Sequence, residues 1–429
     1  MIVAVDDVKL SSASVGKNVA NLVIINSTVL KLKPSNIADT FSPNALILNG
    51  SMFFNDRILA ARKTIVFHTK QPMSLLVIEQ CTIAFGDKTS FIKSTALNVK
   101  VVKNQFSSAE SLKSGMDITG NNIVFRHNKI DTTITGKIKL MTRRSLKMEA
   151  NTFIENKTEA LDLTFPKEQI SSISLKYENL GRTKKNFIVA NVSSIIIKNC
   201  YVKLDEENSF IINAHNFTLA NSEVNTMKRN AMNIQADETI QIQGNTFVHC
   251  QEKAFLKILP QLNNTKVNFI NNFFVSYEKG FLQPPEIDFN LNNLELSNIT
   301  LNEDCSCHLA HNIIAEPKEL LMRQASNEEM QKLNLSLVHK TSVQSHLDLE
   351  KLLVHTINCI DTNSSELTDL LNHSTCFQSN QTESLNLPAE PDMLWVLWVV
   401  LGLVAAMAMA LVAFLMVRTK VLEKRAMGR

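Results

Sequence analysis

The sequence predicts an all-β solenoid ectodomain, followed by a small disulfide-bonded cap with some helix and one transmembrane α-helix. Three observations predict this arrangement. An eight-residue phrase, seen in Ile240–Phe247 as IQIQGNTF, recurs along most of the chain. Four of the seven cysteines follow the last repeat. A long apolar run stands close to the C-terminus.

The repeated phrase occurs in twelve windows whose places one, three and eight are all apolar. Consecutive windows begin 22 to 30 residues apart, and a near-constant period of this length is typical of a solenoid. Apolar residues at alternate places predict a strand with places one and three inside, and stacked coils would supply the core. The windows begin at Leu22, Leu46, Leu76, Val99, Ile123, Leu146, Ile173, Ile195, Phe217, Ile240, Val267 and Leu294.

A second short apolar pattern follows most windows and often opens with a small residue, as in GMDI, AMNI and GFLQ. Two or three short strands in each repeat predict a coil that closes on itself and stacks on the next. The sixth place is frequently asparagine. We expect the chain to bend there, because asparagine tolerates the left-handed conformation. Amides of stacked coils should also hydrogen-bond to each other, giving structural ladders of Asn104, Asn128, Asn151, Asn245 and Asn272.

The phrase I-x-I-x-x-N-x-F, with a small residue before the second strand, resembles the repeat of the pectate-lyase-like superfamily. The resemblance covers about Leu22 to Leu301 and implies a right-handed parallel β-helix of about twelve coils. A leucine-rich repeat is the alternative, because L-x-L-x-x-N-x-L overlaps the phrase. That repeat also needs a leucine three places upstream, where this chain has residues such as Val19, Arg143 and Asp237.

Places two and four are expected to point outward. Charges would alternate along two outward rows, Asp117–Lys139–Asp162 and Arg126–Glu149–Lys176, which favours this register over a shifted one. The second place is apolar in several windows, so we expect either a protein partner or a covering segment of the chain there. The residues of this possible partner surface are Val23, Ile47, Val77, Val124 and Ile196.

Met393–Val417 is a run of 25 residues without a charge, long enough to cross a bilayer as a helix. Trp395 and Trp398 suit the membrane interface, and the tail 418–429 is basic. The positive-inside rule therefore predicts a single-pass type I protein of the plasma or secretory-pathway membrane, with a cytosolic tail. Small residues on one face of the span would permit a homodimer; they are Gly402, Ala406 and Ala410.

The first residues carry no signal-peptide pattern. We therefore expect either a missing N-terminal segment or a tail-anchored protein with its bulk in the cytosol. The charge asymmetry, the cysteines and the glycosylation sequons favour the first. The candidate N-glycosylation sites are Asn26, Asn49, Asn156, Asn191, Asn216, Asn263, Asn298, Asn334, Asn363, Asn372 and Asn380.

The expected domains are the β-helix at 1–301, the cysteine-containing cap at 302–379 and a polar stalk at 380–392. A solenoid end must be capped because it otherwise exposes its core. Four cysteines in the cap predict two disulfides with three possible pairings, although a zinc site of poor spacing is the alternative. They are Cys305, Cys307, Cys359 and Cys376.

The net charge of +3 does not indicate a nucleic-acid partner, and the chain has no phosphate-binding or nucleophile motif, so no cofactor is expected. His68, His127, His215 and His249 look isolated, and acids such as Asp237 look scattered. We therefore predict an extracellular binding, recognition or adhesion module for protein or glycan, and not an enzyme. The alternative is a membrane-anchored polysaccharide lyase or glycoside hydrolase, because many proteins of the superfamily that the repeat resembles cleave acidic polysaccharides.

Overall fold

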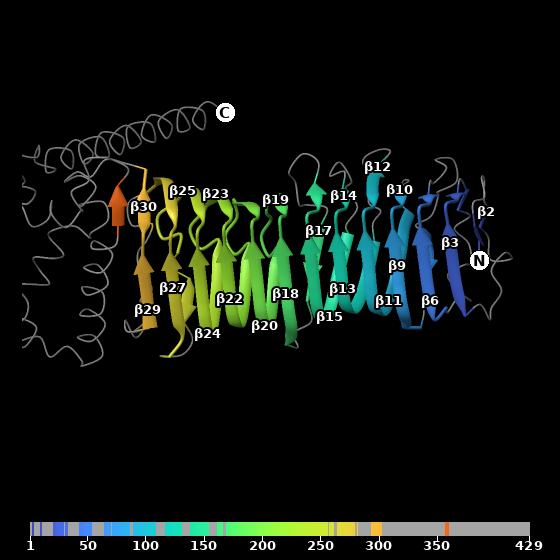
Figure 1. Ribbon diagram of the computed structural model, residues 1–429, viewed down its shortest axis with the longest axis horizontal. Coiled ribbons are helices and arrows are strands. Elements are labelled where there is room, and N and C mark those ends of the chain that lie inside the picture. Colours follow the sequence, from blue (N-terminus) through green and yellow to red (C-terminus); the bar gives the residue numbers. More distant parts are fainter. Residues whose placement is uncertain are drawn as a thin grey trace, which may run out of the picture. The chain divides into compact units, whose positions relative to one another are not determined.

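The computed structural model (Figure 1) describes a set of residues that all belong to Met1–Asp369, the first of two compact units. The second unit, Leu370–Arg429, contains none of them. The predicted stalk, transmembrane span and tail, and all of the predicted cap except Asn302 and the Cys359 strand, therefore lie outside the described residues. The described ranges are 2–3, 9–10, 20–29, 31–32, 43–53, 64–69, 71–85, 89–108, 116–130, 138–153, 161–165, 169–255, 257–260, 264–278, 281, 293–302 and 357–359.

The described strands form a parallel β-solenoid of about nine turns. Its long sheet has 16 strands, and all neighbouring strands in it are parallel. These are β1 (Ile2–Val3), β3 (Asn21–Ile25), β6 (Ala45–Asn49), β8 (Thr64–His68), β9 (Met73–Glu79), β11 (Thr89–Val102), β13 (Met116–Arg126), β15 (Ile138–Glu149), β17 (Leu161–Thr164), β18 (Ile170–Lys176), β20 (Ile188–Lys198), β22 (Phe210–Ala220), β24 (Met232–Gln243), β26 (Ile258–Pro260), β27 (Lys266–Ile270) and β29 (Leu294–Ser297).

Two shorter parallel sheets form another wall of the solenoid. The first has six strands: β4 (Thr28–Val29), β7 (Met52–Phe53), β10 (Thr82–Phe85), β12 (Gln105–Ser108), β14 (Lys129–Ile130) and β16 (Thr152–Phe153). The second has seven: β19 (Asn179–Arg182), β21 (Tyr201–Leu204), β23 (Glu223–Met227), β25 (Thr246–Cys250), β28 (Phe273–Tyr277), β30 (Ile299–Leu301) and β31 (Ile357–Cys359). A separate pair joins β2 (Lys9–Leu10) to β5 (Lys31–Leu32).

The register of the long sheet follows the repeat. Ile240, for example, is opposite Phe217 on one side and Val267 on the other, which are the first places of the adjacent windows. All twelve windows lie on strands of this sheet. The described chain makes about nine turns, fewer than the twelve coils expected.

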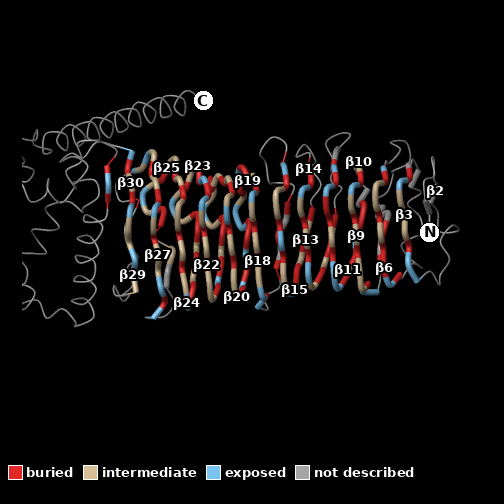
Figure 2. The backbone as a smooth tube through the Cα atoms, in the orientation of Figure 1, coloured by how far each residue is buried: buried red, intermediate tan, exposed pale blue. Residues whose placement is uncertain are grey.

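The core lies where the alternation predicts it. Ile240, Ile242 and Phe247 are fully or nearly fully buried, and Figure 2 shows buried residues alternating with more exposed ones along the strands. Phenylalanines at the eighth place stack between turns, as in Phe247 and Phe274, whose ring centroids are 4.9 Å apart. Stacked apolar rows of this kind supply the burial that a single turn lacks.

The predicted second strand is not separate in most turns, because it continues into the next window as one long strand. β13 and β24 each carry both segments. A register shift marks the join, for example between Ala214 and Asn216. A local bulge turns the strand there without ending it.

The bend lies at the fifth place of the window, one residue earlier than we expected. The backbone is left-handed at this place in all twelve windows. Gly50 and Gly244 stand there where a side chain would collide with Asn26 and Asn221 of the preceding turn. The twelve fifth-place residues, all with positive φ, are Asn26, Gly50, Gln80, Lys103, His127, Ala150, Tyr177, Asn199, Asn221, Gly244, Asn271 and Asn298.

The sixth place instead turns inward and is buried. The Asn104 backbone N–H and side-chain amide both donate to Asn128 Oδ1 at 3.0 Å. Asn128 contacts Asn151 in the same way, and Asn245 contacts Asn272. Each amide also donates to a third-place backbone carbonyl of the preceding turn. The asparagine side chains thus satisfy backbone groups that would otherwise be buried without partners at the bend.

The wall made of the short sheets is interrupted between β16 and β19, whereas the long sheet passes this point through β17 and β18. The first asparagine ladder also ends here, on Glu178, which takes the sixth place of the seventh window. We call residues 151–182 the joint, because one wall is continuous across it and the other is not.

Among the described residues, no helix is long and apolar enough to span a membrane. The predicted span, its Gly402, Ala406 and Ala410 face, and the partner cysteines Cys305, Cys307 and Cys376 lie outside those residues. Cys359 is buried in β31. It is not a free thiol, and no cysteine within the described part is bonded to it. The predicted pairing of the four cysteines therefore stays a prediction.

Candidate functional site

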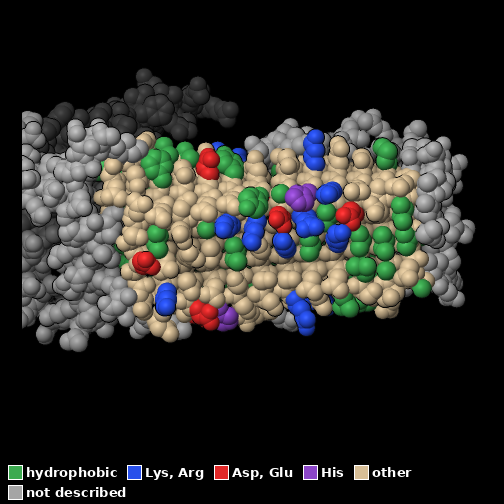
Figure 3. All heavy atoms as spheres, viewed as in Figure 1, with side chains coloured by type: hydrophobic (Ala, Val, Ile, Leu, Met, Phe, Trp, Pro, Cys, Tyr) green, Lys and Arg blue, Asp and Glu red, His purple; other side chains and the backbone are tan. Residues whose placement is uncertain are grey.

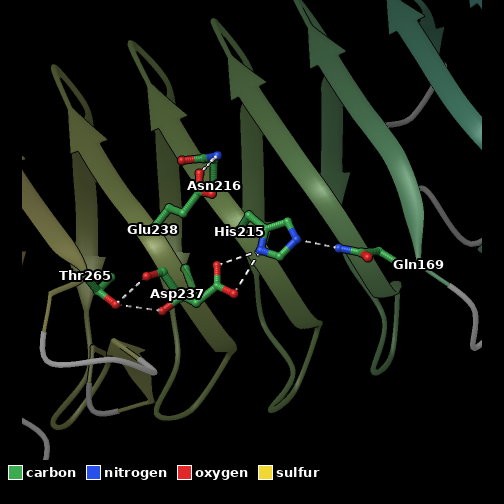
Figure 4. A network of polar contacts seen from close by, with 7 residues as sticks. Gln169, His215, Asn216, Asp237, Glu238 and Thr265 are labelled. Carbon is green, nitrogen blue, oxygen red and sulfur yellow. Dashed lines mark hydrogen bonds and ion pairs between the residues drawn. The ribbon is translucent and has the colours of Figure 1, made fainter.

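A polar network lies at a corner of the solenoid where long strands bulge (Figure 4). His215 occupies the register shift of β22, and Asp237 and Glu238 occupy the facing shift of β24. The bulge turns these side chains outward, away from the core. His215 and Asp237 are 41% and 27% exposed, so the network is open to solvent.

The contacts of His215 fix its ring. Its Nδ1 is 2.8 Å from both carboxylate oxygens of Asp237, and its Nε2 is 2.8 Å from the Gln169 amide nitrogen. With the Nδ1 proton donated to Asp237, Nε2 accepts the hydrogen bond of the amide. The Asn216 amide donates to Glu238 at 2.7 Å. His215 and Asp237, which looked isolated in the sequence, are therefore partners.

An aspartate that orients a neutral imidazole is one arrangement that can transfer a proton. In this case the remaining ring nitrogen is already bonded to Gln169, and the network joins neighbouring turns at their corner. The described residues contain no cluster of His, Cys, Asp or Glu that could hold a metal ion. The same contacts also have a structural explanation, because they hold the neighbouring strands in register at the bulged corner.

A second candidate lies on the outward side of the long sheet and the adjoining bend. Seven cations gather on five consecutive turns, and only two carboxylates, Glu79 and Glu149, stand among them in the same rows. Figure 3 shows Lys and Arg side chains gathered over the middle of this face. We call this set the cationic cluster; it consists of Lys100, Lys103, Arg126, Lys129, Lys147, Lys176 and Lys198.

Among the described residues, only two members of the cluster form an ion pair. Lys100 bonds to Glu79 at 2.8 Å and Lys147 to Glu149 at 3.0 Å. The hydrogen bond from Lys147 and the charges of Lys147, Arg126 and His127 hold the pKa of Glu149 below its usual range. The other five cations form no ion pair with any described residue. The formal excess of about five charges therefore exceeds the net charge of the whole chain, +3.

Tyr177 lies beside the cationic cluster, at the bend of the seventh repeat window, which begins at Ile173. It is 58% exposed and has a φ of 55°. A large side chain in the left-handed region is unfavourable. Its backbone N–H donates to the carbonyl of Lys198 at 3.0 Å, and Lys176 precedes it. Because the fifth place of every window has this conformation, the exposed aromatic ring, and not the backbone, sets Tyr177 apart.

The predicted apolar partner surface is only partly continuous. Val23, Ile47 and Val77 are direct neighbours on β3, β6 and β9, and all are half-buried. Lys100 stands between Val77 and Val124, and Ile196 has Ser174 beside it. Apolar side chains gather at the N-terminal end of the face in Figure 3. The predicted surface is thus a continuous patch only at Val23, Ile47 and Val77, whereas Val124 and Ile196 are separate from it.

The predicted glycosylation sites differ in exposure. Asn26, Asn191 and Asn298 are exposed, whereas Asn49 and Asn216 are half-buried. Asn298 and Asn216 have hydrogen-bonded amides. The remaining sequons, Asn156, Asn263, Asn334, Asn363, Asn372 and Asn380, lie outside the described residues.

Comparisons with protein-family models, with curated proteins and with solved structures each found no match. The assignment of a site therefore depends on the geometry alone. The net charge of the chain concealed the cationic cluster. Its signal in the sequence is the column of Lys and Arg at outward places when the windows from Val99 to Ile195 are aligned.

Proposed function

We propose that this chain is a membrane-anchored extracellular protein whose solenoid acts as a binding, recognition or adhesion module for protein or glycan. In finer detail, we propose a right-handed β-helix of the pectate-lyase-like kind, with about twelve coils. The cationic cluster is the observation that carries the functional proposal. It is an outward charge excess on a regular sheet, and the core does not require it.

The scaffold suits binding because its surface is ordered before a ligand arrives. Hydrogen bonds on both sides of each strand and the buried asparagine ladders hold the outward rows in place. A surface that is already ordered loses less conformational entropy when it binds. The long sheet therefore presents its charges at fixed spacing.

A membrane-anchored carbohydrate-active enzyme remains the second candidate, and the His215–Asp237 pair is the observation that favours it. A base of this kind contributes typically ~100-fold or more to a rate. Against an enzyme, acids such as Glu79 and Asp205 in the described residues already form ion pairs with neighbouring cations.

The test is a binding screen of the full-length chain in detergent against arrayed glycans and extracellular proteins. We expect a ligand whose binding weakens when the cationic cluster is neutralised and is unchanged in His215→Asn. Turnover of an arrayed polysaccharide that disappears in His215→Asn would instead establish the enzyme. Binding that is unaffected by the cluster would contradict the assignment of the surface.

A further inference from the structure

We propose that the cationic cluster binds a linear sulfated polysaccharide. This inference rests on the proposed function, because it names the class of ligand for the same surface. Three properties of the cluster lead to it: its composition, the spacing of its charges, and the exposed ring of Tyr177.

Six of the seven cations are lysines. Lysine is depleted in protein–protein interfaces, where arginine and aromatic residues are enriched. A lysine ammonium is a compact, strongly hydrated point charge that is well suited to attracting many anionic groups without exact pairing. The composition therefore fits a polyanion better than a folded protein partner.

The charges form rows that follow the axis of the stack. Lys176 and Lys198 are direct neighbours on β18 and β20, so their backbones are separated by about one strand spacing, ~4.8 Å. Lys100 and Lys147 are two strands apart on β11 and β15, or ~9.6 Å. Lys103 and Lys129 add charges at the bend and just beyond it. A linear polymer with regularly spaced anions can contact such rows along its length.

The surface is an open sheet face, which suits an extended hydrated chain. Cations at exposed places release counterions when a polyanion binds, and this gives affinity that falls steeply with salt. Sulfate groups stay ionised over the whole physiological pH range, so they match a row of lysines. Tyr177 offers the apolar face of a ring next to Lys176, where the carbon-bound hydrogens of a sugar can pack.

Nucleic acid is the other class of linear polyanion. The exposed sequons Asn26 and Asn191 and the proposed anchor favour a sulfated glycan, because they accompany an extracellular location. The arms of the experiment separate these two ligands.

The experiment uses the full-length chain in detergent, with heparin and duplex DNA as probes. One variant neutralises Lys103, Lys129, Lys176 and Lys198 as Lys→Gln; all are outward, and Gln80 shows that glutamine is accepted at the bend. The matched control removes the same charge elsewhere on the described surface, with Lys→Gln at Lys184, Lys185, Lys228 and Lys266.

We expect wild type to bind heparin and to elute at a higher salt concentration than the cluster variant. The cluster variant should bind ~1,000-fold more weakly at low salt, with a smaller salt slope, because four charge contacts are lost. The control variant should behave as wild type. Tyr177→Ala should weaken binding and leave the salt slope unchanged, because it removes a contact without removing a charge.

Failure of wild type to bind heparin would overturn this inference. In that case a protein or neutral-glycan ligand from the screen above would leave the proposed function standing. Equal losses in the cluster and control variants would show that total charge, and not this surface, attracts heparin. Tighter binding to duplex DNA than to heparin would assign the cluster to nucleic acid, which also contradicts the inference.

Discussion

Asn128 illustrates how a single side chain serves three turns of the stack. Its Oδ1 accepts from the backbone and the side chain of Asn104, and its amide donates to Asn151 and to the Val101 carbonyl. All of these groups lie in the interior, where an unpaired polar group is costly. The residue therefore contributes to folding through groups that belong to its neighbours.

Replacing Asn128 by leucine should lower the free energy of unfolding by about 3 kcal/mol or more, because it leaves several buried groups unpaired. Chemical denaturation measures the change. The matched control is Asn122→Leu on the same turn, since Asn122 is exposed. Its cost should be below about 0.5 kcal/mol. Similar losses in the two variants would show that the ladder has no special part in stability.

Tyr177 is expected to show the opposite relation between stability and function. Tyr177→Asn should raise the free energy of unfolding by about 0.5–1 kcal/mol, because asparagine tolerates a positive φ. The same change should weaken heparin binding. Tyr201→Asn is the control: Tyr201 lies within β21 and has no positive φ, so asparagine should lower stability there. Lower stability of Tyr177→Asn in thermal denaturation would contradict the proposed strain.

The joint is the clearest feature at the scale of the structural element. Glu178 accepts hydrogen bonds there through Oε1 from Asn151, while its Oε2 is buried with no hydrogen-bond partner in the described part of the chain. Burial raises the pKa of this carboxyl from 4.5 to about 8, against the lowering effect of the Asn151 hydrogen bonds. At neutral pH the group is therefore protonated, which keeps a charge out of the joint.

A buried acid with a raised pKa makes stability fall with pH. Between pH 4.5 and about 8 the unfolded chain releases this proton and the folded chain keeps it, so the free energy of unfolding decreases through that window. Glu178→Gln should lose this part of the pH dependence in urea denaturation. Glu149→Gln should keep it, because the pKa of Glu149 is lowered and lies outside the window. An unchanged slope in Glu178→Gln would contradict the raised pKa.

The sequence predicted the strands well and the turns less well, for a physical reason. The apolar residues at alternate places of each window predict which side chains are buried, so Ile240, Ile242 and Phe247 could be placed inside from the pattern alone. The bend could not, because Lys103, His127 and Tyr177 give no sign of a left-handed conformation, and the chain adopts it to keep the stack in register. Asparagine is frequent at the sixth place, next to the bend, and for that reason the bend was wrongly predicted there.

Contacts between turns were also hard to predict from the sequence. His215 and Asp237 are 22 residues apart, and a bulge that adds one residue to a strand brings them together. The sequence pattern does not predict this extra residue. The cationic cluster depends in the same way on the register of five turns. The windows would have shown it when aligned in columns.

The location of the whole protein can be tested through its sequons. Enzymatic removal of N-glycans should lower the apparent mass of the chain expressed in animal cells, since we propose that the solenoid is extracellular. Asn191→Gln should remove one increment of that shift, because Asn191 is exposed on β20. Asn213→Gln is the control, because Asn213 is its exposed neighbour without a sequon. A mass unaffected by the enzyme would favour the tail-anchored, cytosolic alternative.

The interrupted wall at the joint also has a mechanical consequence for the solenoid. At the joint the long sheet carries its hydrogen bonds from turn to turn, whereas β16 and β19 belong to different sheets. Beside these two strands, the turns are linked by the hydrogen bonds from Asn151 to Glu178 Oε1. A load at the end of the solenoid should therefore open the wall of short sheets here before it separates the strands of the long sheet.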